Sequence, residues 1–543
     1  MWKKGWRDDI WSGLDQNWDL IIIGGGITGA GILKEATRAG LKVLLVEAND
    51  FAAGTSSRSS KLVHGGFRYL KNGQIKMTFD SVRERERLIR EGRGLINPLG
   101  FVIACNRSDP IPSWLFGIGL SLYDLLAARW SHRYYDETRI KELCPELEMP
   151  GLTGGYRYID ALTDDARLVL RIIRESIRDG GIALNYAKVE GLLHKRAGQV
   201  CGIQLRDVSP EGDNRCLEIP AKMVVSATGA WADNLRALQG RHAGRPLLRK
   251  LRGSHLVFPW DRIPLTRAVS ILHPRNRRPV FTFPWEGVTI IGTTDVDHAH
   301  DIDEEPAISG DEIEYLLKAV QHTFPGQQLT IEDVRSTFSG IRAVINTGKK
   351  DPSKESREHA VVYEDGLLTI TGGKLTTFRL MAVTTLKFLK QKCAFRFDFD
   401  PDQPILDTPD PSSIIDLDVE GAIRLRLLGR FGSEIGSFLD SAKIEELSTI
   451  NSTPVLLGEL RWAARNEGVV HLDDLLLRRV RLGLTLPDGA LPWIGEIRRI
   501  VQPELGWDDS RWEAELSAYE KRYRSNYSIR ISQDSETRTL HSS

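Results

Sequence analysis

The chain has 543 residues, enough for about two to four domains of the usual size. Its 73 Lys and Arg residues balance its 73 Asp and Glu residues, which excludes the strong overall positive charge typical of nucleic-acid-binding proteins. The five cysteines are odd in number and form no CxxC pair, a pattern that fits a reducing compartment and argues against a zinc or iron–sulfur site.

Two stretches are candidates for contact with a membrane surface, although neither is long enough to cross a bilayer comfortably. The N-terminus has no apolar secretory signal and places Trp2, Trp6 and Trp11 among basic residues. Segment 112–133, PSWLFGIGLSLYDLLAARWSHR, joins a long apolar face to cations such as Arg129. Aromatic and basic residues together favour an anionic lipid surface, so we expect a cytoplasmic protein attached to the cytoplasmic face of the membrane. The alternative is that 112–133 covers the core of the protein itself.

The glycine-rich segment 19–47, DLIIIGGGITGAGILKEATRAGLKVLLVE, predicts a strand, a tight turn, a helix and a second strand. Gly24, Gly26 and Gly29 occupy the GxGxxG positions. The first glycine permits the turn, the second lets the backbone approach a pyrophosphate, and the third allows close helix–strand packing. Glu47 ends the second strand, where its carboxylate can accept hydrogen bonds from ribose hydroxyls. We therefore predict a dinucleotide-binding site.

Later segments return to the same sheet, and the composition then changes. AKMVVSATGAWAD (221–233) is an apolar strand, GLLTITGGKLTTFRLMAVTTLKFL (366–389) is a strand, a Gly-Gly turn and a helix, and a Pro/Asp-rich linker follows. We predict an α/β fold: a Rossmann-like nucleotide-binding domain, an inserted, largely antiparallel substrate domain and a helical C-terminal domain. The predicted boundaries are 17–80, 155–235 and 335–395 for the nucleotide-binding domain, 81–154 and 236–334 for the substrate or cap domain, 405–525 for the helical domain and 526–543 for a frayed tail.

Several motifs in a fixed order carry a resemblance to a known family. Besides the Gly24–Glu47 unit they are TSSRSSKLVHGGFRYL (55–70), TDDARLVL (163–170), ATGAWAD (227–233), GSHLVFP (253–259), IIGTTD (290–295), SGIRAV (339–344) and GGKLTTFR (372–379). Together they resemble the FAD-dependent glycerol-3-phosphate dehydrogenases, within the wider D-amino-acid-oxidase-like flavoprotein superfamily. The resemblance covers residues 17–390, and DDLLLRRVRLGL extends it into the helical domain. It implies oxidation of sn-glycerol 3-phosphate to dihydroxyacetone phosphate, a step of glycerol metabolism, with electrons passing through FAD to a quinone or another acceptor.

The resemblance also implies which residues hold FAD. A flavin has to be held along its phosphates and its ring, so the hydroxyl-rich loop can donate to phosphate and ribityl oxygens, and the turn at GGKLTTFR can direct amides at the flavin ring. The expected cofactor-binding residues are Gly24, Gly26, Ile27, Thr28, Gly29, Glu47, Thr55, Ser56, Ser57, Ser60, Lys61, Leu62, His64, Gly65, Gly229, Gly373, Lys374, Leu375 and Thr376.

Binding of a phosphate that is nearly dianionic requires cations. Arg342 and Lys374 carry over from the family motifs as catalytic and substrate-binding residues, and Arg68 and Arg357 as substrate-binding residues. The alternative for any single arginine is a solvated surface position. The family often has proline after the arginine of SGIR, whereas this chain has Ala343, which loosens the backbone without removing the cation.

Oxidation at C2 also requires a base for the hydroxyl proton. His255 in GSHLVFP matches the family position and is the expected catalytic base and a substrate neighbour, with His64 as the competing candidate. A hydrogen-bonded core histidine is the other interpretation of His255. The acidic and His-rich segment 295–305 lacks the spacing of a calcium loop, so we predict no metal site.

Other functions stay open on the sequence alone. A glycerol-3-phosphate oxidase would pass electrons to oxygen, and a related flavin enzyme would oxidise an amine or amino acid. A flavin-bound protein without turnover is a third alternative, but it would have no need of a base and a cation cluster. The sequence also leaves open a homodimer.

Overall fold

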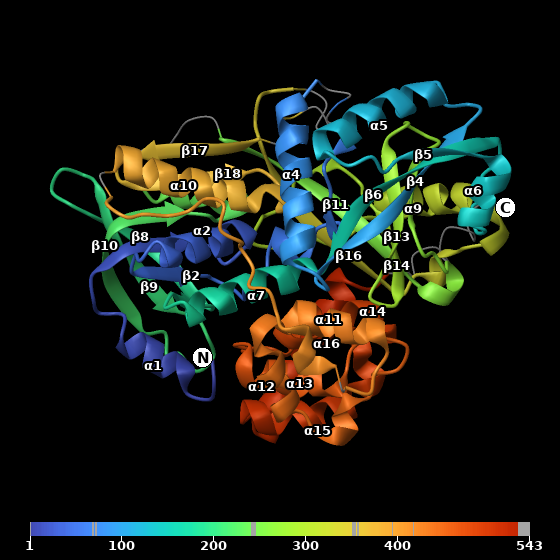
Figure 1. Cartoon of the computed structure of the whole chain (residues 1–543). Coiled ribbons are helices and arrows are strands. Elements are labelled where there is room, and N and C mark those ends of the chain that lie inside the picture. The colour runs from blue at the N-terminus through green and yellow to red at the C-terminus, as the bar shows by residue number, and fades with distance from the viewer. Residues whose placement is uncertain are drawn as a thin grey trace, which may run out of the picture.

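The computed structural model describes residues 2–67, 70, 73–239, 246–349, 355, 358–393, 395–415 and 417–529. Two mixed sheets lie side by side, and the C-terminal helices pack beneath them (Figure 1). This arrangement confirms the predicted α/β class, with a Rossmann-like domain, a largely antiparallel second domain and a helical C-terminal domain.

The first sheet has eight strands and a parallel centre, as expected where helices cover both sides of buried apolar strands. The strands of its main path, in spatial order, are β17 (His359–Glu364), β18 (Leu367–Gly372), β10 (Cys216–Ser226), β1 (Trp18–Ile23), β2 (Val43–Val46) and β7 (Ile182–Leu184). Strands β8 (Ala187–His194) and β9 (Val200–Asp207) extend β10 as an antiparallel ribbon. The associated helices are α2 (Ile27–Arg38), α7 (Asp165–Arg178), α8 (Ala232–Ala237) and α10 (Phe378–Lys392).

The second sheet has ten strands, and nearly all of its pairings are antiparallel. Its strands are β15 (Val296–Asp297), β11 (Leu248–Pro259), β14 (Val288–Gly292), β13 (Pro279–Trp285), β12 (Ala268–Leu272), β4 (Ile96–Asn106), β6 (Leu152–Thr163) and β3 (Leu62–Val63), with β16 (Ser336–Ile345) beside β11 and β5 (Arg133–Asp136) beside β6. Helices α4 (Ile75–Glu91), α5 (Ser113–Ala127), α6 (Glu137–Leu143) and α9 (Gly310–Thr323) surround it.

Three strands within the predicted nucleotide-binding ranges lie in the second sheet. The predicted ranges 17–80, 155–235 and 335–395 contain β3, most of β6 and β16. In the structure, β3 pairs with β6, β6 with β4 and β16 with β11, all in the second sheet. Strand β11 pairs with β16 over Leu248–Val257 and with β14 over His255–Pro259, which places β16 in the second sheet. The chain returns from the second sheet to the first after β6 and again after β16.

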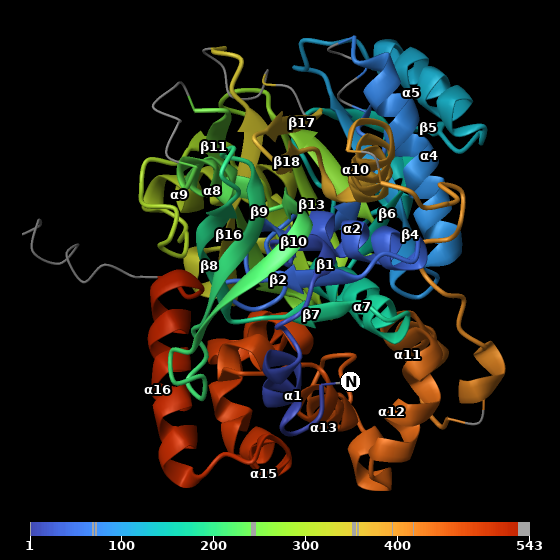
Figure 2. The ribbon, with the colours of Figure 1, turned by 90° about the vertical axis from the view of Figure 1, so that its left-hand side faces the viewer.

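The C-terminal domain consists of short helices joined by turns: α11 (Gly421–Phe431), α12 (Ile435–Ser441), α13 (Leu457–Asn466), α14 (Leu482–Thr485), α15 (Ile494–Leu505), α16 (Asp509–Asn526) and a π-helical segment (Asp474–Arg479). It packs against the second sheet and contacts helix α7 and the residues after β7 in the first domain (Figure 2). Helix α16 reaches Asn526, and Tyr527 is buried, so the first residues of the predicted tail are ordered; residues 530–543 lie outside the described part.

Buried ion pairs join the C-terminal domain to the nucleotide-binding domain. Arg478 and Arg479 both bond the carboxylate of Asp50 at 2.6 Å, directly after the first βαβ unit. Arg481 bonds Asp164 at 3.1 Å and also Asp165, at the start of α7. Removing one partner of such a buried pair leaves an uncompensated charge, which typically costs about 3–5 kcal/mol.

Two of the three tryptophans in the N-terminal segment are packed inside the protein. Helix α1 (Trp6–Ser12) lies beneath the first sheet, and Trp2 and Trp11 are each only 3 % exposed. The Trp2 ring stacks on Phe51 with 5.0 Å between centroids. Trp2 and Trp11 therefore do not contact lipid, because they are packed inside the protein, whereas Trp6 is half-buried.

Candidate active site

A cavity of about 2320 Å³ runs between the two sheets. The glycine turn, the hydroxyl-rich loop and the Gly372–Gly373 turn lie on the side of the first sheet. Strands β11, β13 and β16 contribute the opposite wall, and helix α5 and the C-terminal domain contribute to the ends. The predicted cofactor residues that line the cavity are Gly24, Gly26, Ile27, Thr28, Glu47, Thr55, Ser56, Ser60, Leu62, His64, Gly229, Gly373, Lys374, Leu375 and Thr376.

The turn after β1 has the close packing that the fingerprint predicts. Gly24 adopts φ +113°, and a Cβ there would lie 2.6 Å from the carbonyl oxygen of Ala227. A Cβ at Gly29 would lie 1.9 Å from the carbonyl oxygen of Gly24. Gly26 faces the cavity, and a Cβ there would lie 3.1 Å from Ser56 Oγ. The start of α2 is therefore open to a pyrophosphate, which a helix N-terminus favours.

Glu47 lies at the end of β2, as predicted, and its carboxylate is fixed by the backbone. It accepts hydrogen bonds from the amide of Gly25 at 2.7 Å and from the amide of Asn49 at 2.9 Å. Burial raises its pKa, and these two amide bonds act in the opposite direction. The carboxylate lines the cavity at the end of the second strand, the position at which a Rossmann domain binds a ribose. The described residues thus fit a dinucleotide such as FAD.

Four of the expected cofactor residues do not line the cavity. Gly29 packs inside the turn, and Gly65 donates its amide to Asp160. Ser57 is buried, and its carbonyl accepts from the Lys61 ammonium at 2.9 Å. The Lys61 ammonium also bonds the Asp165 carboxylate at 3.0 Å. Burial lowers the pKa of Lys61 to about 8, with Asp165 opposing the shift. The Lys61 side chain therefore belongs to the core, a placement that the local sequence did not indicate.

His255 lies on β11 between β14 and β16, and it lines the cavity although its side chain is buried. Its Nε2 atom is 2.9 Å from Ser60 Oγ, and its ring stacks on Phe338 with 4.4 Å between centroids. Gly292 makes room for this ring, since a Cβ there would lie 2.1 Å from it. Burial lowers the pKa of His255 well below its usual value, and the nearby charges of Lys61 and Arg342 lower it further. The imidazole is therefore neutral at neutral pH.

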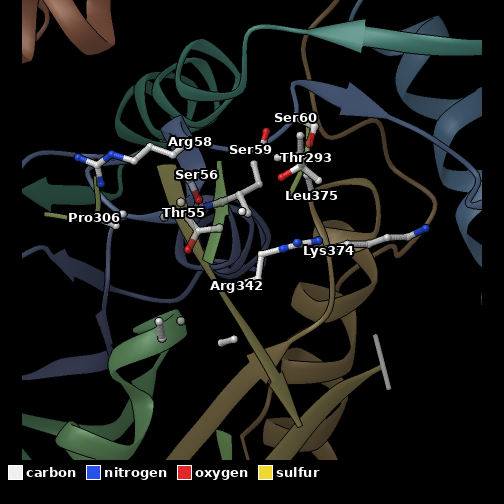
Figure 3. A pocket seen from close by; sticks show the side chains of 18 of the residues that line it. Thr55, Ser56, Arg58, Ser59, Ser60, Thr293, Pro306, Arg342, Lys374 and Leu375 are labelled. Carbon is white, nitrogen blue, oxygen red and sulfur yellow. Dashed lines mark hydrogen bonds between the residues drawn. The ribbon is translucent and has the colours of Figure 1, made fainter. Parts of the chain in front are cut away.

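Two of the predicted cations, Arg342 and Lys374, line this cavity. Arg342 on β16 donates to Asp295 Oδ1 at 2.7 Å and to the carbonyl of Thr294 at 3.0 Å. Lys374 lies in the turn after β18, and its ammonium is 3.4 Å from the carbonyl oxygen of His64. Figure 3 shows the Arg342 side chain reaching toward the segment of Lys374, with Ser60 and Thr293 nearby. Arg68 and Arg357 lie outside the described residues.

The turn that carries Lys374 and Leu375 differs slightly from expectation. A short 3₁₀ turn (Leu375–Thr377) precedes α10, and the Thr376 hydroxyl donates to the carbonyl of His64 at 3.1 Å. Since Lys374 bonds the same carbonyl, this turn fixes the loop that carries His64. The two segments that the sequence assigned to the flavin ring are thus in direct contact.

Sequence reasoning gave no role to several residues that line the cavity. Thr293 lies in the family motif IIGTTD, while Arg278 lies in a hairpin outside the family motifs. Side chains of α5 line one end of the cavity, and side chains of the C-terminal domain line another part of it. No local pattern could assign these to the site, because the second sheet and the helical domain bring them there.

The comparisons with known proteins agree with this arrangement. Residues 19–379 match the family model described as FAD dependent oxidoreductase, and residues 404–512 match that of the C-terminal domain of alpha-glycerophosphate oxidase. An aerobic glycerol-3-phosphate dehydrogenase of Staphylococcus haemolyticus is 33 % identical over 86 % of this chain and 87 % of its own. The chain belongs to the FAD-dependent glycerol-3-phosphate dehydrogenase family.

Other family members and solved structures give the same result. The aerobic glycerol-3-phosphate dehydrogenase of Bacillus subtilis is 39 % identical over 68 % of this chain and 66 % of its own. The crystal structure of a glycerol-3-phosphate dehydrogenase from Bacillus halodurans, complexed with FAD, superposes with a TM-score of 0.78 at 28 % identity, covering 97 % of this chain and 98 % of that one. As in this family, the enzyme is an FAD-dependent oxidoreductase.

Proposed function

We propose that this enzyme oxidises sn-glycerol 3-phosphate to dihydroxyacetone phosphate. The observation that carries the proposal is that a buried neutral histidine and two cations line the same cavity as the dinucleotide fingerprint. The names of the relatives support the substrate. An amino-acid substrate would require a carboxylate clamp, whereas the cations here suit a phosphate dianion.

In the proposed reaction the C2–H and O–H bonds of the substrate break and a carbonyl forms. Bound FAD supplies the acceptor for the hydride from C2. His255 accepts the hydroxyl proton, and burial keeps its imidazole in the neutral form that this step requires. Ser60 holds the ring through Nε2, and among the described residues Nδ1 has no hydrogen-bond partner. Stacking on Phe338 restricts the ring to one plane.

Arg342 and Lys374 bind the phosphate group in this proposal. A guanidinium carries five N–H donors, so one edge can hold Asp295 while another binds phosphate oxygens. Lys374 supplies a point charge from the opposite wall of the cavity. Arg68 and Arg357 remain expected contributors that lie outside the described residues.

We further propose that the electron acceptor is a quinone and that the enzyme acts at an anionic membrane surface. Helix α5 supports both, since Leu115, Ile118 and Leu122 line the cavity and are also exposed on the surface of the protein. The part of the cavity that these side chains line is continuous with the exposed apolar face of α5, and this arrangement suits a lipid-dissolved acceptor. Among the described helices none is both long and apolar enough to cross a membrane.

The test is anaerobic addition of glycerol 3-phosphate to the purified yellow protein. We expect the flavin absorbance to bleach, and we expect glycerol at the same concentration to leave it unchanged because it lacks the phosphate. A short-chain quinone should then restore the colour faster than oxygen does. A reconstituted FAD protein that glycerol 3-phosphate does not bleach would contradict the proposed substrate, and faster recovery with oxygen would favour the oxidase alternative.

A further inference from the structure

A single carboxylate joins two arginines in the wall of the cavity. Asp295 is buried and follows β14, and its two oxygens have different partners. Oδ1 accepts from Arg342 Nη2 at 2.7 Å, whereas Oδ2 accepts from Arg278 Nη2 at 2.5 Å. Arg278 also donates from Nη1 to the Asp295 carbonyl at 3.1 Å. The three side chains thus form a continuous chain, Arg278–Asp295–Arg342.

The second sheet determines where the three side chains Arg278, Asp295 and Arg342 lie. Strand β11 separates the two ends of the contact, because β16 with Arg342 pairs on one side of it and β15, just after Asp295, pairs on the other. The Arg342 guanidinium has to cross the strand to reach Asp295. Gly253 of β11 permits the crossing, since a Cβ there would lie 3.1 Å from Arg342 Nη2 and 2.6 Å from Thr293 Oγ1.

The charges explain why two arginines are needed. A buried carboxylate beside a phosphate site would repel the phosphate and compete with it for Arg342. Arg278 supplies the second positive charge, so the chain of two arginines and one aspartate keeps a net positive charge beside the cavity. The bidentate contact of Arg278 with the side chain and the carbonyl of Asp295 also fixes the direction of the carboxylate.

We propose that Asp295 and Arg278 are positioning residues that hold the Arg342 guanidinium across Gly253 and thereby set the affinity of the site for the phosphate group. The inference rests on the proposed function for the identity of the substrate. It does not require Arg278 to touch the substrate, because its effect passes through Asp295 to Arg342.

The test compares Asp295→Asn and Arg278→Gln with the parent holoenzyme, with Arg275→Gln as the matched control. Arg275 belongs to the same hairpin but pairs with Glu314 at 3.0 Å on the surface. The probe is inorganic phosphate, whose binding is followed by the change in the flavin absorbance spectrum. We expect its dissociation constant to rise about 10-fold or more in the two variants, as for loss of a hydrogen bond to a charged group, and to stay unchanged in the control.

Kinetics separate positioning from a merely structural role. The KM for glycerol 3-phosphate should rise in parallel with the phosphate dissociation constant, while kcat, FAD content and the melting temperature stay close to those of the parent. Arg278 is partly exposed, so its variant keeps the proposal testable if Asp295→Asn fails to fold. Unchanged phosphate affinity in Arg278→Gln overturns the proposal.

A double-mutant cycle tests the route of the effect. If Arg278 acts through Arg342, then Arg278→Gln should add almost nothing in an Arg342→Gln background. Additive losses would mean that Arg278 binds phosphate independently and would overturn the positioning role. The proposed substrate is judged separately. If inorganic phosphate binds the two variants more weakly than the parent but glycerol 3-phosphate fails to bleach the flavin of the parent, the substrate assignment fails and the positioning role of Asp295 and Arg278 stands.

Discussion

At the scale of single residues, the environment of His255 determines the protonation state of its imidazole. Its ring is enclosed by Phe338, Ser60 and the space that Gly292 leaves, and two cations lie nearby. Burial and those charges disfavour the imidazolium, so the pKa lies well below the usual value of 6.5. A proton acceptor needs the neutral form, and this environment keeps it available at any pH near or above neutrality.

We expect the rate of flavin reduction by glycerol 3-phosphate to fall only at a pH well below 6.5, where His255 becomes protonated. His255→Gln should lower this rate by about 10²–10⁴-fold, the usual contribution of a general base, while FAD stays bound. Stopped-flow measurements of flavin bleaching across pH give both the pH at which the rate falls and the loss of rate in His255→Gln.

The Lys61→Met variant tests whether the charge of Lys61 lowers the pKa of His255. Removing this buried positive charge should raise the pKa of His255, so the acid limb of the rate profile should move to higher pH. A limb that stays in place in Lys61→Met, or that lies at 6.5 or above in the parent, would contradict the assignment of the limb to His255.

At the scale of elements, helix α5 has two unlike faces. Leu120 and Tyr123 pack into the core, whereas Ile118 is 61 % exposed, Leu125 71 % and Trp130, just beyond the helix, 70 %. A monomer seldom exposes so many large apolar side chains on one helix without a functional reason. The interpretation that segment 112–133 covers the core therefore holds for one face of the helix, and the exposed apolar face is the one that we propose contacts the membrane.

Leu125→Glu combined with Trp130→Glu should weaken binding to vesicles that contain phosphatidylglycerol, because each change places a charge on the apolar face. Neither residue lines the cavity, so flavin reduction by glycerol 3-phosphate should be unaffected. Cosedimentation measures the binding. Ile444→Glu, at a position that is 90 % exposed on the C-terminal domain, is the matched control. A parent enzyme that stays in the supernatant with these vesicles would refute the membrane role.

The local signals in the sequence predicted the parts of the site that the chain builds from neighbouring residues. Gly24, Gly26 and Glu47 lie where the fingerprint requires, because their geometry is set within one βαβ unit. Lys61 looked equally suitable as a cofactor neighbour, yet its side chain turns into the core, where Asp165 from a distant helix compensates its charge. Arg278 could not be found, since only the sheet brings it to Asp295.

At the scale of the whole molecule, the helical domain is held to the nucleotide-binding domain by charge as well as by apolar contact. Asp50 accepts from Arg478 and Arg479, and its backbone neighbour Asn49 lines the cavity. Burial alone would raise the pKa of Asp50, but the charges of Arg479 and Arg478 hold it well below its usual value of 3.8. The domain contact and the wall of the cofactor site therefore share one carboxylate.

Asp50→Asn should lower the free energy of unfolding at pH 7 by about 3–5 kcal/mol, because it leaves two buried guanidiniums without a counter-charge. Since the folded pKa of Asp50 is depressed, its contribution is complete above pH 3.8 and is lost as the pH falls below that value. Chemical denaturation of parent and variant at pH 7 and at lower pH should give a difference that shrinks with acid. A difference that is small at pH 7 would show that the Asp50 contact contributes little to stability.

The long range of the contacts around Asp50 and Asp165 has a consequence for biosynthesis. The loop that holds the hydroxyl-rich segment is synthesised early, but its counter-charges, Arg478, Arg479 and Arg481, come hundreds of residues later. Strand β18, which completes the parallel centre of the first sheet, is also late. A nascent chain therefore lacks these buried arginine contacts until the ribosome has passed residue 481, so stable loading of the cofactor is expected only after nearly the whole polypeptide has been made.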